Sequence, residues 1–374
     1  MEPFKDFINR DLISTLGRIF LRVSPNFDVE AFNAAASNGL NKLELKQRVI
    51  QVRDALDATL PQAFDQRCTA LVASLHPSED TDRDGVKFSD EGACGFAVWP
   101  LTELVPHCGL DHPEQSLDVL KEMTKRFSSE FAVRPFLVHH EAVSLRLFRK
   151  WTTDENRHVR RLVSEGSRPR LPWGIRLHRF VDDPAPLIPL LEALKDDPEE
   201  YVRRSVANNL NDIAKDHSKT VVSVANKWME SAPKPRVKLV KHACRTLIKN
   251  GDTGALAVFG YHAAKHVEAS IKIATPVVQY GEHLEFSVAL QGLKPGGNLM
   301  VDYIVHFVKA NGTRSPKVFK WMDKQAVATS CLNATRRHAI KPITTRKYYA
   351  GTHQLELMVN GVSLGSEEFE LLMP

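Results

Sequence analysis

A recurring pattern at helix starts constrains most of this chain. Val159-Arg160-Arg161, Val202-Arg203-Arg204 and Val237-Lys238 each open a helical stretch, and Val133-Arg134 opens an earlier one. The first three starts are 43 and 35 residues apart, which brackets the period of HEAT-type helical hairpins, about 40 residues. Such repeats stack into a solenoid with a concave face. We therefore expect an all-α, HEAT-like repeat solenoid over residues 1–266.

The pattern changes near Val267, where alternation replaces helical spacing. Runs of alternating apolar residues lie at 284–290, 301–307 and 355–359. Asn311-Gly312 and Asn360-Gly361 follow such runs, and Asn-Gly between alternating runs is a strong hairpin signal. We expect an all-β, immunoglobulin-like sandwich over residues 267–374, and therefore a multidomain chain.

Composition excludes several protein classes. The 374 residues are 43% hydrophobic and 25% charged, as in an ordinary globular protein, which excludes a membrane bundle and wholesale disorder. The charged start of the chain is unlike a signal peptide, and no stretch approaches a membrane span. The five cysteines form no Cys-x-x-Cys pair, so we expect free thiols in a reducing cytoplasm and no metal site.

Positive charge is concentrated in one segment. Residues 149–179 hold nine Lys+Arg against three Asp+Glu, whereas the whole chain has a net charge of only +5. Arginine dominates, and its planar fork suits bidentate contacts with phosphate. Two interpretations remain open: a basic ribbon that follows a duplex backbone, or arginines that pair with acidic residues of neighbouring repeats.

Within this segment, Ser164–Gly174 contains two prolines, which forbid a regular helix. The chain therefore leaves a helix near Glu165 and continues as a rigid connection that ends at Trp173. Glu165, a carboxylate among arginines, is held ionised, and serves either as a salt-bridge partner or as a catalytic group. Trp173 is either a packing residue or a platform for a ligand.

The motif Glu165-Gly166-Ser167-Arg168-Pro169-Arg170-Leu171-Pro172-Trp173-Gly174 resembles the signature of the AlkC branch of the AlkC/AlkD DNA alkylation-repair glycosylases. The pair Arg160-Arg161 and the segment 202–210 also fit that family. So does the order of HEAT-like repeats followed by an immunoglobulin-like domain.

The resemblance implies a monofunctional DNA glycosylase that initiates base excision repair. Its substrates would be cationic N3-alkylated bases, 3-methyladenine and 3-methylcytosine, in double-stranded DNA, cleaved without base flipping. It implies no cofactor and no metal. The expected protein is a monomer with no obligate protein partner and no membrane association, in a bacterial cytoplasm and bound to the nucleoid through DNA.

The resemblance also assigns roles to residues. Glu165 would be the leading catalytic carboxylate, Glu130 and Asp212 would support it, and Trp173 would lie against the lesion or its deoxyribose. The expected DNA-binding residues of the helical region are Arg160, Arg161, Arg168, Arg170, Arg203, Arg204 and Lys238.

The implied chemistry suits these residue types. Cleavage of a base from deoxyribose passes through an oxocarbenium-like state, which a nearby carboxylate stabilises. A cationic base is already a good leaving group and needs no general acid. Carboxylates and an aromatic face would also attract a cationic lesion.

Two further alternatives stay open. Arg336 and Arg337 lie among basic residues that we place in loops or at strand ends of the sandwich domain, where they either contact DNA or form an ordinary solubilising surface. The whole chain is either the enzyme described above or a non-catalytic HEAT-repeat scaffold that binds nucleic acid or protein.

Overall fold

The computed structural model describes residues 4–326, 331–344 and 346–374. Its contacts divide the chain into two compact units. Unit 1 runs to Asp216 and includes Lys234–Ala243, and unit 2 consists of His217–Pro233 and Cys244–Pro374.

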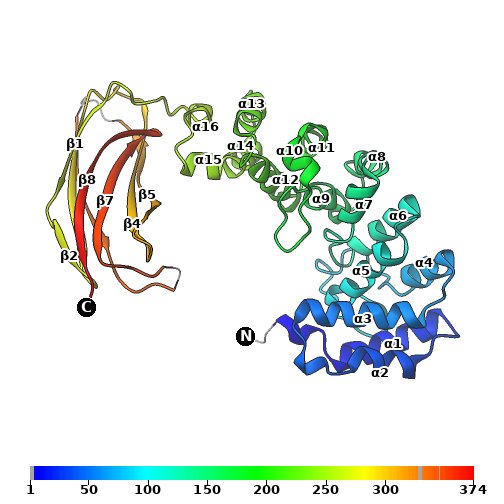
Figure 1. The fold of residues 1–374 in the computed structure, drawn as a ribbon. Coiled ribbons are helices and arrows are strands. Elements are labelled where there is room, and N and C mark those ends of the chain that lie inside the picture. Colours follow the sequence, from blue (N-terminus) through cyan, green and yellow to red (C-terminus); the bar gives the residue numbers. More distant parts are fainter. Residues whose placement is uncertain (1–3, 327–330, 345) are drawn as a thin grey trace. The chain divides into compact units, whose positions relative to one another are not determined.

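Unit 1 is entirely helical within the residues that the structure describes (Figure 1). Its helices are η1 (Phe4–Phe7), α1 (Arg10–Val23), α2 (Val29–Ser37), η2 (Leu40–Lys42), α3 (Leu45–Thr59), α4 (Phe64–Ala73), η3 (Gly95–Ala97), α5 (Val98–Cys108), α6 (Pro113–Thr124), α7 (Arg134–His139), α8 (Glu141–Trp151), α9 (Arg157–Gly166), α10 (His178–Asp182), η4 (Ala185–Leu187), α11 (Ile188–Leu194), α12 (Glu200–Ile213) and α14 (Lys234–Ala243).

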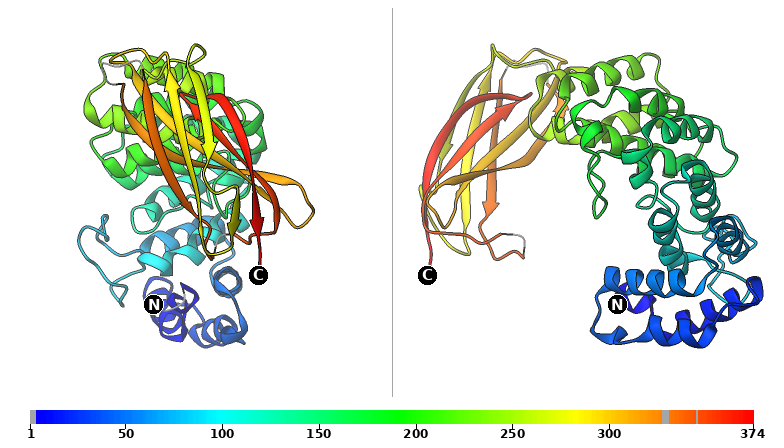
Figure 2. Two further views of the ribbon diagram at one scale, coloured as in Figure 1. Left: turned by 90° about the vertical axis from the view of Figure 1, so that its left-hand side faces the viewer. Right: turned by 45° about the vertical axis from the view of Figure 1, so that its right-hand side comes forward.

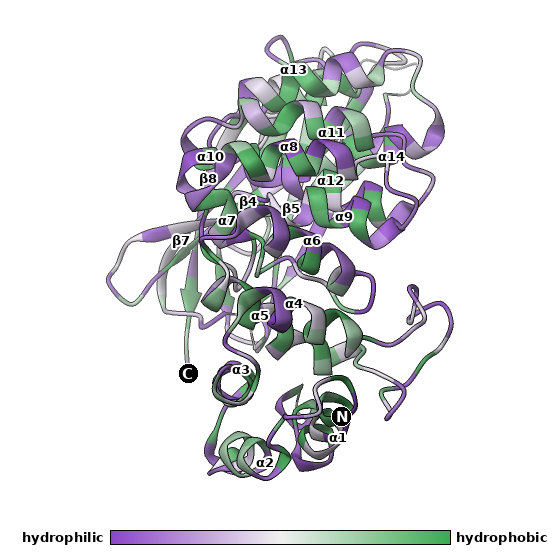
Figure 3. Ribbon diagram, turned by 90° about the vertical axis from the view of Figure 1, so that its right-hand side faces the viewer, coloured by the Kyte–Doolittle hydropathy of each residue, from purple (hydrophilic) through white to green (hydrophobic). Residues whose placement is uncertain are grey.

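The helices stack because each carries an apolar stripe. Figure 3 shows hydrophobic and hydrophilic residues on different sides of the same helices. On α9 the buried stripe includes Val159, Leu162 and Val163, and α12 packs against it and then against α14. The predicted helix starts at 159, 202 and 237 fall in the first turns of α9, α12 and α14. The start at 133 lies one residue before α7.

Helix α9 has clear start and stop signals. The side chain of Asn156 accepts a hydrogen bond of 2.9 Å from the backbone N–H of His158, which satisfies a free donor at the helix start. At the other end, a Cβ on Gly166 would lie 2.6 Å from Val133, so only glycine allows α7 to approach this closely. The end of α9 is thereby fixed against α7.

Unit 2 combines helices with two β-sheets. Its helices are α13 (Ser218–Met229), α15 (Arg245–Lys249) and α16 (Thr253–Val258). Its strands are β1 (Glu268–Ile273), β2 (Val277–Gln279), β3 (His283–Gln291), β4 (Asn298–Val308), β5 (Arg314–Gln325), β6 (Leu332–Ala339), β7 (Gly351–Val359) and β8 (Val362–Leu372).

The two sheets have the orders β1-β3-β6 and β2-β8-β7-β4-β5, and Figure 2 shows them as separate layers. The alternating residues of β3, β4 and β7 fill the space between them, as the sequence predicts. The Asn-Gly pairs form the β4–β5 and β7–β8 hairpins, where Asn360 and Gly361 both have positive φ. Helical structure ends at Val258 and strands begin at Glu268; the domain boundary at 266/267 stays a prediction.

Segments after α16 pack on the five-stranded sheet within unit 2. The side chain of Asn360 donates 2.9 Å to the carbonyl of His262, and Asn298 donates 3.1 Å to that of Phe259. The Tyr261 hydroxyl donates 2.5 Å to Asp323. None of the described helices is long and apolar enough to cross a membrane.

Candidate active site

Glu165 lies in the last turn of α9 and is buried. One carboxylate oxygen accepts 2.7 Å from Nη1 of Arg168, and the other accepts 2.6 Å from the hydroxyl of Ser205 on α12. Asn209, one turn after Ser205, donates 2.8 Å to the carbonyl of Ser164 and holds α12 in register with α9. Both oxygens of Glu165 are therefore oriented by fixed donors.

Two arginines join three carboxylates into a continuous chain of charges. Arg161 donates 2.7 Å to Glu130 and lies 3.7 Å from Glu165. Arg168 bonds Glu165 through Nη1 and Asp212 through Nε, the latter at 2.8 Å. We call these five residues the carboxylate–arginine chain. The catalytic residues expected from the sequence are thus brought together.

The electrostatics of this chain keep Glu165 ionised. Burial alone would raise the pKa of Glu165, but the charges of Arg161 and Arg168 and the bond from Ser205 outweigh burial and lower it. Burial alone would lower the pKa of Arg168, but its bond to Asp212 and the charge of Glu165 outweigh burial and raise that pKa. Glu165 is therefore a carboxylate at neutral pH and cannot act as a general acid there.

A cleft of about 410 Å³ opens beside the carboxylate–arginine chain. Its polar lining consists of Glu130, Glu165 and Arg168. Its aromatic lining consists of Phe4, Phe96, Trp99, Phe127, Phe131 and Trp173. Asp212 is buried and is bonded to Arg168. Glu130 and Glu165 are therefore the carboxylates in reach of a ligand, while Asp212 holds Arg168.

Trp173 is the most exposed of the aromatic residues that line the cleft, followed by Phe4. Its side chain is 69% exposed, which excludes the interpretation of Trp173 as a packing residue. Its φ is 66°, a left-handed conformation that is strained for a residue with a bulky side chain. The indole is thus presented at the cleft rather than folded into the core.

Comparison with known proteins gives two full-length similarities. The Bacillus subtilis (strain 168) protein described as "Uncharacterized protein YhaZ" is 36% identical over 373 residues, 99% of this chain and 100% of that protein. The Pseudomonas fluorescens alkylpurine DNA glycosylase AlkC, solved bound to DNA containing an abasic site analog, is 36% identical with a TM-score of 0.81, covering 99% of this chain and 100% of that one.

The chain belongs to the AlkC family. This confirms the resemblance of the Glu165–Gly174 motif and the expected order of helical repeats followed by a sandwich. A family model for the C-terminal Ig-like domain of the uncharacterised protein YhaZ matches residues 267–373.

Several arginines around the AlkC motif pair with acidic residues of the neighbouring repeat. Arg160 bonds both oxygens of Asp197, at 2.6 and 3.1 Å, and Arg170 bonds both oxygens of Asp216, at 2.9 and 2.8 Å. Arg161 and Arg168 belong to the carboxylate–arginine chain. Arg160 and Arg170 thus form the expected ladder between repeats, and their contact with DNA stays a prediction.

The other predicted DNA-binding residues of the helical region lie more openly. Arg203, Arg204 and Lys238 line a groove of about 180 Å³ between α12 and α14. The side chains of Arg204 and Lys238 are 66% and 71% exposed, although both lie near Glu200. These cations keep donors available for an anionic partner of this AlkC-family chain.

The predicted position of Arg336 and Arg337, in loops or at strand ends, is wrong. Both lie within strand β6, an edge strand, where Arg337 pairs with Glu285 of β3 and their side-chain atoms are 2.8 Å apart. Both arginines are exposed.

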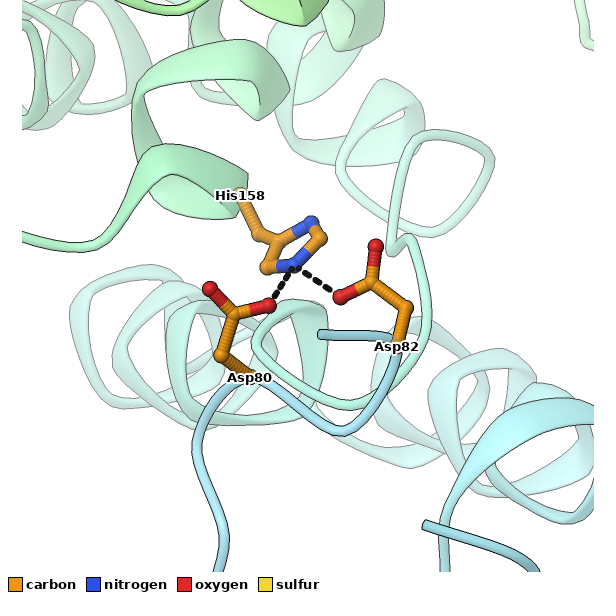
Figure 4. Close-up of side chains that lie close together, drawn as sticks. All are labelled: Asp80, Asp82 and His158. Atoms are coloured by element: carbon orange, nitrogen blue, oxygen red, sulfur yellow. Dashed lines mark hydrogen bonds and ion pairs between the residues drawn. The ribbon is translucent and has the colours of Figure 1, made fainter. Parts of the chain in front are cut away.

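A second group of charged side chains lies at the start of α9. Nε2 of His158 is 3.2 Å from Asp80 and 3.0 Å from Asp82 (Figure 4), and the three ligand atoms are close enough together to hold a metal ion. However, Arg157 donates 2.8 Å to Asp80 and 2.7 Å to Asp82. Its bonds lower the pKa of Asp80, so a guanidinium already neutralises this carboxylate pair.

Reasoning from the sequence missed several residues of the AlkC-family site. It did not identify Ser205, Ser128, which donates 2.7 Å to Glu130, or the fully buried Arg134. It also missed the aromatic wall, whose rings come from separate segments. The available signal was local: Phe127 and Phe131 flank Glu130, and Phe96 and Trp99 are one helical turn apart.

Proposed function

We propose that this chain is a monofunctional DNA glycosylase that hydrolyses the N-glycosidic bond of cationic N3-alkylated bases in duplex DNA. The substrates are 3-methyladenine and 3-methylcytosine, and the reaction initiates base excision repair. The observation that carries this proposal is the lowered pKa of Glu165, at a cleft lined with aromatic rings.

An ionised carboxylate restricts the substrate class. A neutral base needs a proton to leave, but Glu165 has none to give at neutral pH. A cationic base leaves as a neutral molecule without protonation. The carboxylate of Glu165 stabilises the positive charge that then develops at the sugar, as in glycoside hydrolysis.

The lining of the cleft supports cleavage without base flipping. An enzyme that flips a base reads its hydrogen-bonding edge in a closely fitting pocket. The described polar lining here is limited to Glu130, Glu165 and Arg168, which suits a cationic sugar and base better than a neutral edge. Water rather than an amine is the nucleophile in this proposal, since the charged groups of the lining are two carboxylates and a guanidinium.

The likeness to the AlkC structure supports DNA as the partner, since that protein was solved with DNA containing an abasic site analog. In this chain the exposed cations Arg204 and Lys238 would hold phosphates, while Glu130 and Glu165 contact the lesion.

The test is release of free base from a duplex that contains 3-methyladenine, measured by mass spectrometry. We expect release by the wild type and loss of release in Glu165→Gln, with affinity for abasic-analogue DNA retained. Glu155→Gln, at an exposed glutamate on the turn before α9, is the matched control and should remain active.

A folded wild-type protein that releases no base from any alkylated duplex would favour the scaffold interpretation. A fully active Glu165→Gln variant would refute the assigned role of Glu165. Treatment with borohydride should trap no covalent complex with DNA, as expected when water is the nucleophile.

A further inference from the structure

The connection after α9 is held at both ends by one buried residue. We call residues 167–175 the Trp173 loop. Arg134 of α7 is fully buried and donates 2.8 Å to the carbonyls of Gly166 and Arg168, before and within the loop. Through Nε it also donates 2.7 Å to the carbonyl of Ile175, at the end of the loop. These bonds fix the ends of the loop. Its apex closes in a turn, in which the backbone N–H of Gly174 donates 3.2 Å to the carbonyl of Leu171.

The apex is the strained residue Trp173. A left-handed φ at a tryptophan is unfavourable and persists only where surrounding contacts enforce it. The indole itself cannot supply those contacts, because it is largely exposed. The constraint must therefore act on the backbone of Trp173.

Besides the turn bond from Gly174 to Leu171, Lys46 constrains this backbone from a distant part of the chain. Its Nζ donates 2.7 Å to the carbonyl oxygen of Trp173, across 127 residues of sequence. The same ammonium lies 5.8 Å from the ring centroid of Phe131, another wall of the cleft. A charged donor gives a stronger hydrogen bond than a neutral one. An exposed lysine that bridges two parts of one cleft is thus well placed to hold its mouth.

We propose that Lys46 is a positioning residue, which holds the backbone of Trp173 so that the indole stays at the mouth of the cleft beside Glu165. The inference rests on the proposed function for the role of Trp173 at the lesion. The inference goes further than the proposed function, because it assigns control over the placement of the Trp173 side chain to a residue of α3, which lies outside the family motif. Removal of Lys46 leaves the bonds from Arg134 and the turn bond from Gly174 in place, but removes the tie between α3 and the carbonyl of Trp173.

The first experiment reads the position of Trp173 without any substrate. The protein is labelled with 5-fluorotryptophan, and the ¹⁹F resonance of Trp173 is identified by its loss in Trp173→Phe. We expect Lys46→Met to shift or split this resonance while those of the other tryptophans stay in place. Lys46→Arg keeps charged donors and should restore the wild-type signal. Lys42→Met, at an exposed lysine of η2, is the control and should change nothing.

The second experiment separates the chemical step from DNA binding. With 3-methyladenine duplex and saturating enzyme, we expect Lys46→Met to lower the single-turnover excision rate about tenfold, because a small misplacement near the reacting centre is costly. Its Kd for abasic-analogue DNA should stay close to that of the wild type, and Lys46→Arg should recover most of the rate.

The outcomes distinguish this inference from the proposed function. An unchanged Trp173 resonance in Lys46→Met overturns the positioning role, and so does a loss confined to DNA affinity, which would make Lys46 a phosphate contact. If the resonance moves but Trp173→Ala excises at the wild-type rate, Lys46 positions Trp173 and the lesion role of Trp173 in the proposed function fails.

Discussion

Arg160 and Asp197 form a two-point ion pair between consecutive repeats, with side chains only 12% and 2% exposed. Arg160 also donates 2.9 Å to the carbonyls of Asp154 and Glu155, on the turn before its own helix. The pair therefore joins the starts of α9 and α12. This geometry assigns Arg160 a structural contribution, whatever it adds to DNA binding.

Arg160→Ala should destabilise the fold because it leaves the Asp197 carboxylate buried without its cation. We expect the free energy of unfolding to fall by about 3 kcal/mol, measured by urea denaturation. Arg204→Ala is the matched control, since its pair with Glu200 is exposed, and should cost less than about 0.5 kcal/mol. An unchanged midpoint for Arg160→Ala together with weaker DNA binding would contradict the structural assignment.

Arg204 and Lys238 should account for much of the salt dependence of DNA binding. Loss of one contact between a cation and a phosphate lowers the magnitude of the slope of log K against log salt concentration by about one. We expect this decrease in Arg204→Gln and in Lys238→Gln. Binding to a fluorescent duplex is titrated at several salt concentrations. Arg146→Gln, at an exposed arginine of α8, is the control. Slopes that match the wild type would show that the α12–α14 groove does not face phosphates.

Ser205→Ala should change the pH dependence of excision. The serine hydroxyl bonds the ionised form of Glu165 and helps to lower its pKa, so loss of the bond raises that pKa. The acid limb of the pH–rate profile should then move to higher pH. Ser144→Ala removes another buried serine, which bonds the carbonyl of His140, and should leave the profile unchanged. If the acid limb lies at the same pH in Ser205→Ala and in Ser144→Ala, Glu165 does not control that limb.

Asp302→Asn should stabilise unit 2 at neutral pH. Burial, with repulsion from Asp323, raises the pKa of Asp302 to about 6, and one of its oxygens is buried without a hydrogen-bond partner. The folded state thus holds this proton more tightly than the unfolded chain. Its contribution to stability is complete below the unfolded pKa of about 4 and is lost as the pH rises through about 6, by up to about 3 kcal/mol.

The measurement for Asp302→Asn is urea unfolding between pH 4 and pH 8, followed by circular dichroism. The wild type should lose stability from the acidic end of this range toward its middle, and the variant should lose less. Parallel stability curves for the two proteins would contradict the raised pKa.

Local patterns in the sequence predict much of this fold. The spacing of apolar residues identifies the helices around Val159 and Val202, and Asn-Gly identifies two hairpins, because these signals act between near neighbours. The structure also joins Glu130, Glu165 and Asp212, the three carboxylates that the resemblance names, through two arginines. Their catalytic role stays a prediction.

Features that depend on packing between distant segments could not be predicted. The partner of Arg160 lies one repeat further along, and no pattern distinguishes Asp197 from the adjacent Asp196, which instead pairs with Arg236. The hydrogen bond from Lys46 to Trp173 ends on a backbone carbonyl. Every residue has such a carbonyl, so the sequence does not indicate which one accepts the bond.

The bonds from Asn298 and Asn360 to the segment after α16 bear on how this chain can be divided for experiments. A fragment that starts at the first strand would lack the carbonyls of Phe259 and His262, so the amide groups of Asn298 and Asn360 would each lose a hydrogen bond. A fragment that ends before the first strand would leave the carbonyls of Phe259 and His262 without these amide donors. The change from helix to strand is thus a poor place to cut, and a stable sandwich fragment should begin no later than Cys244.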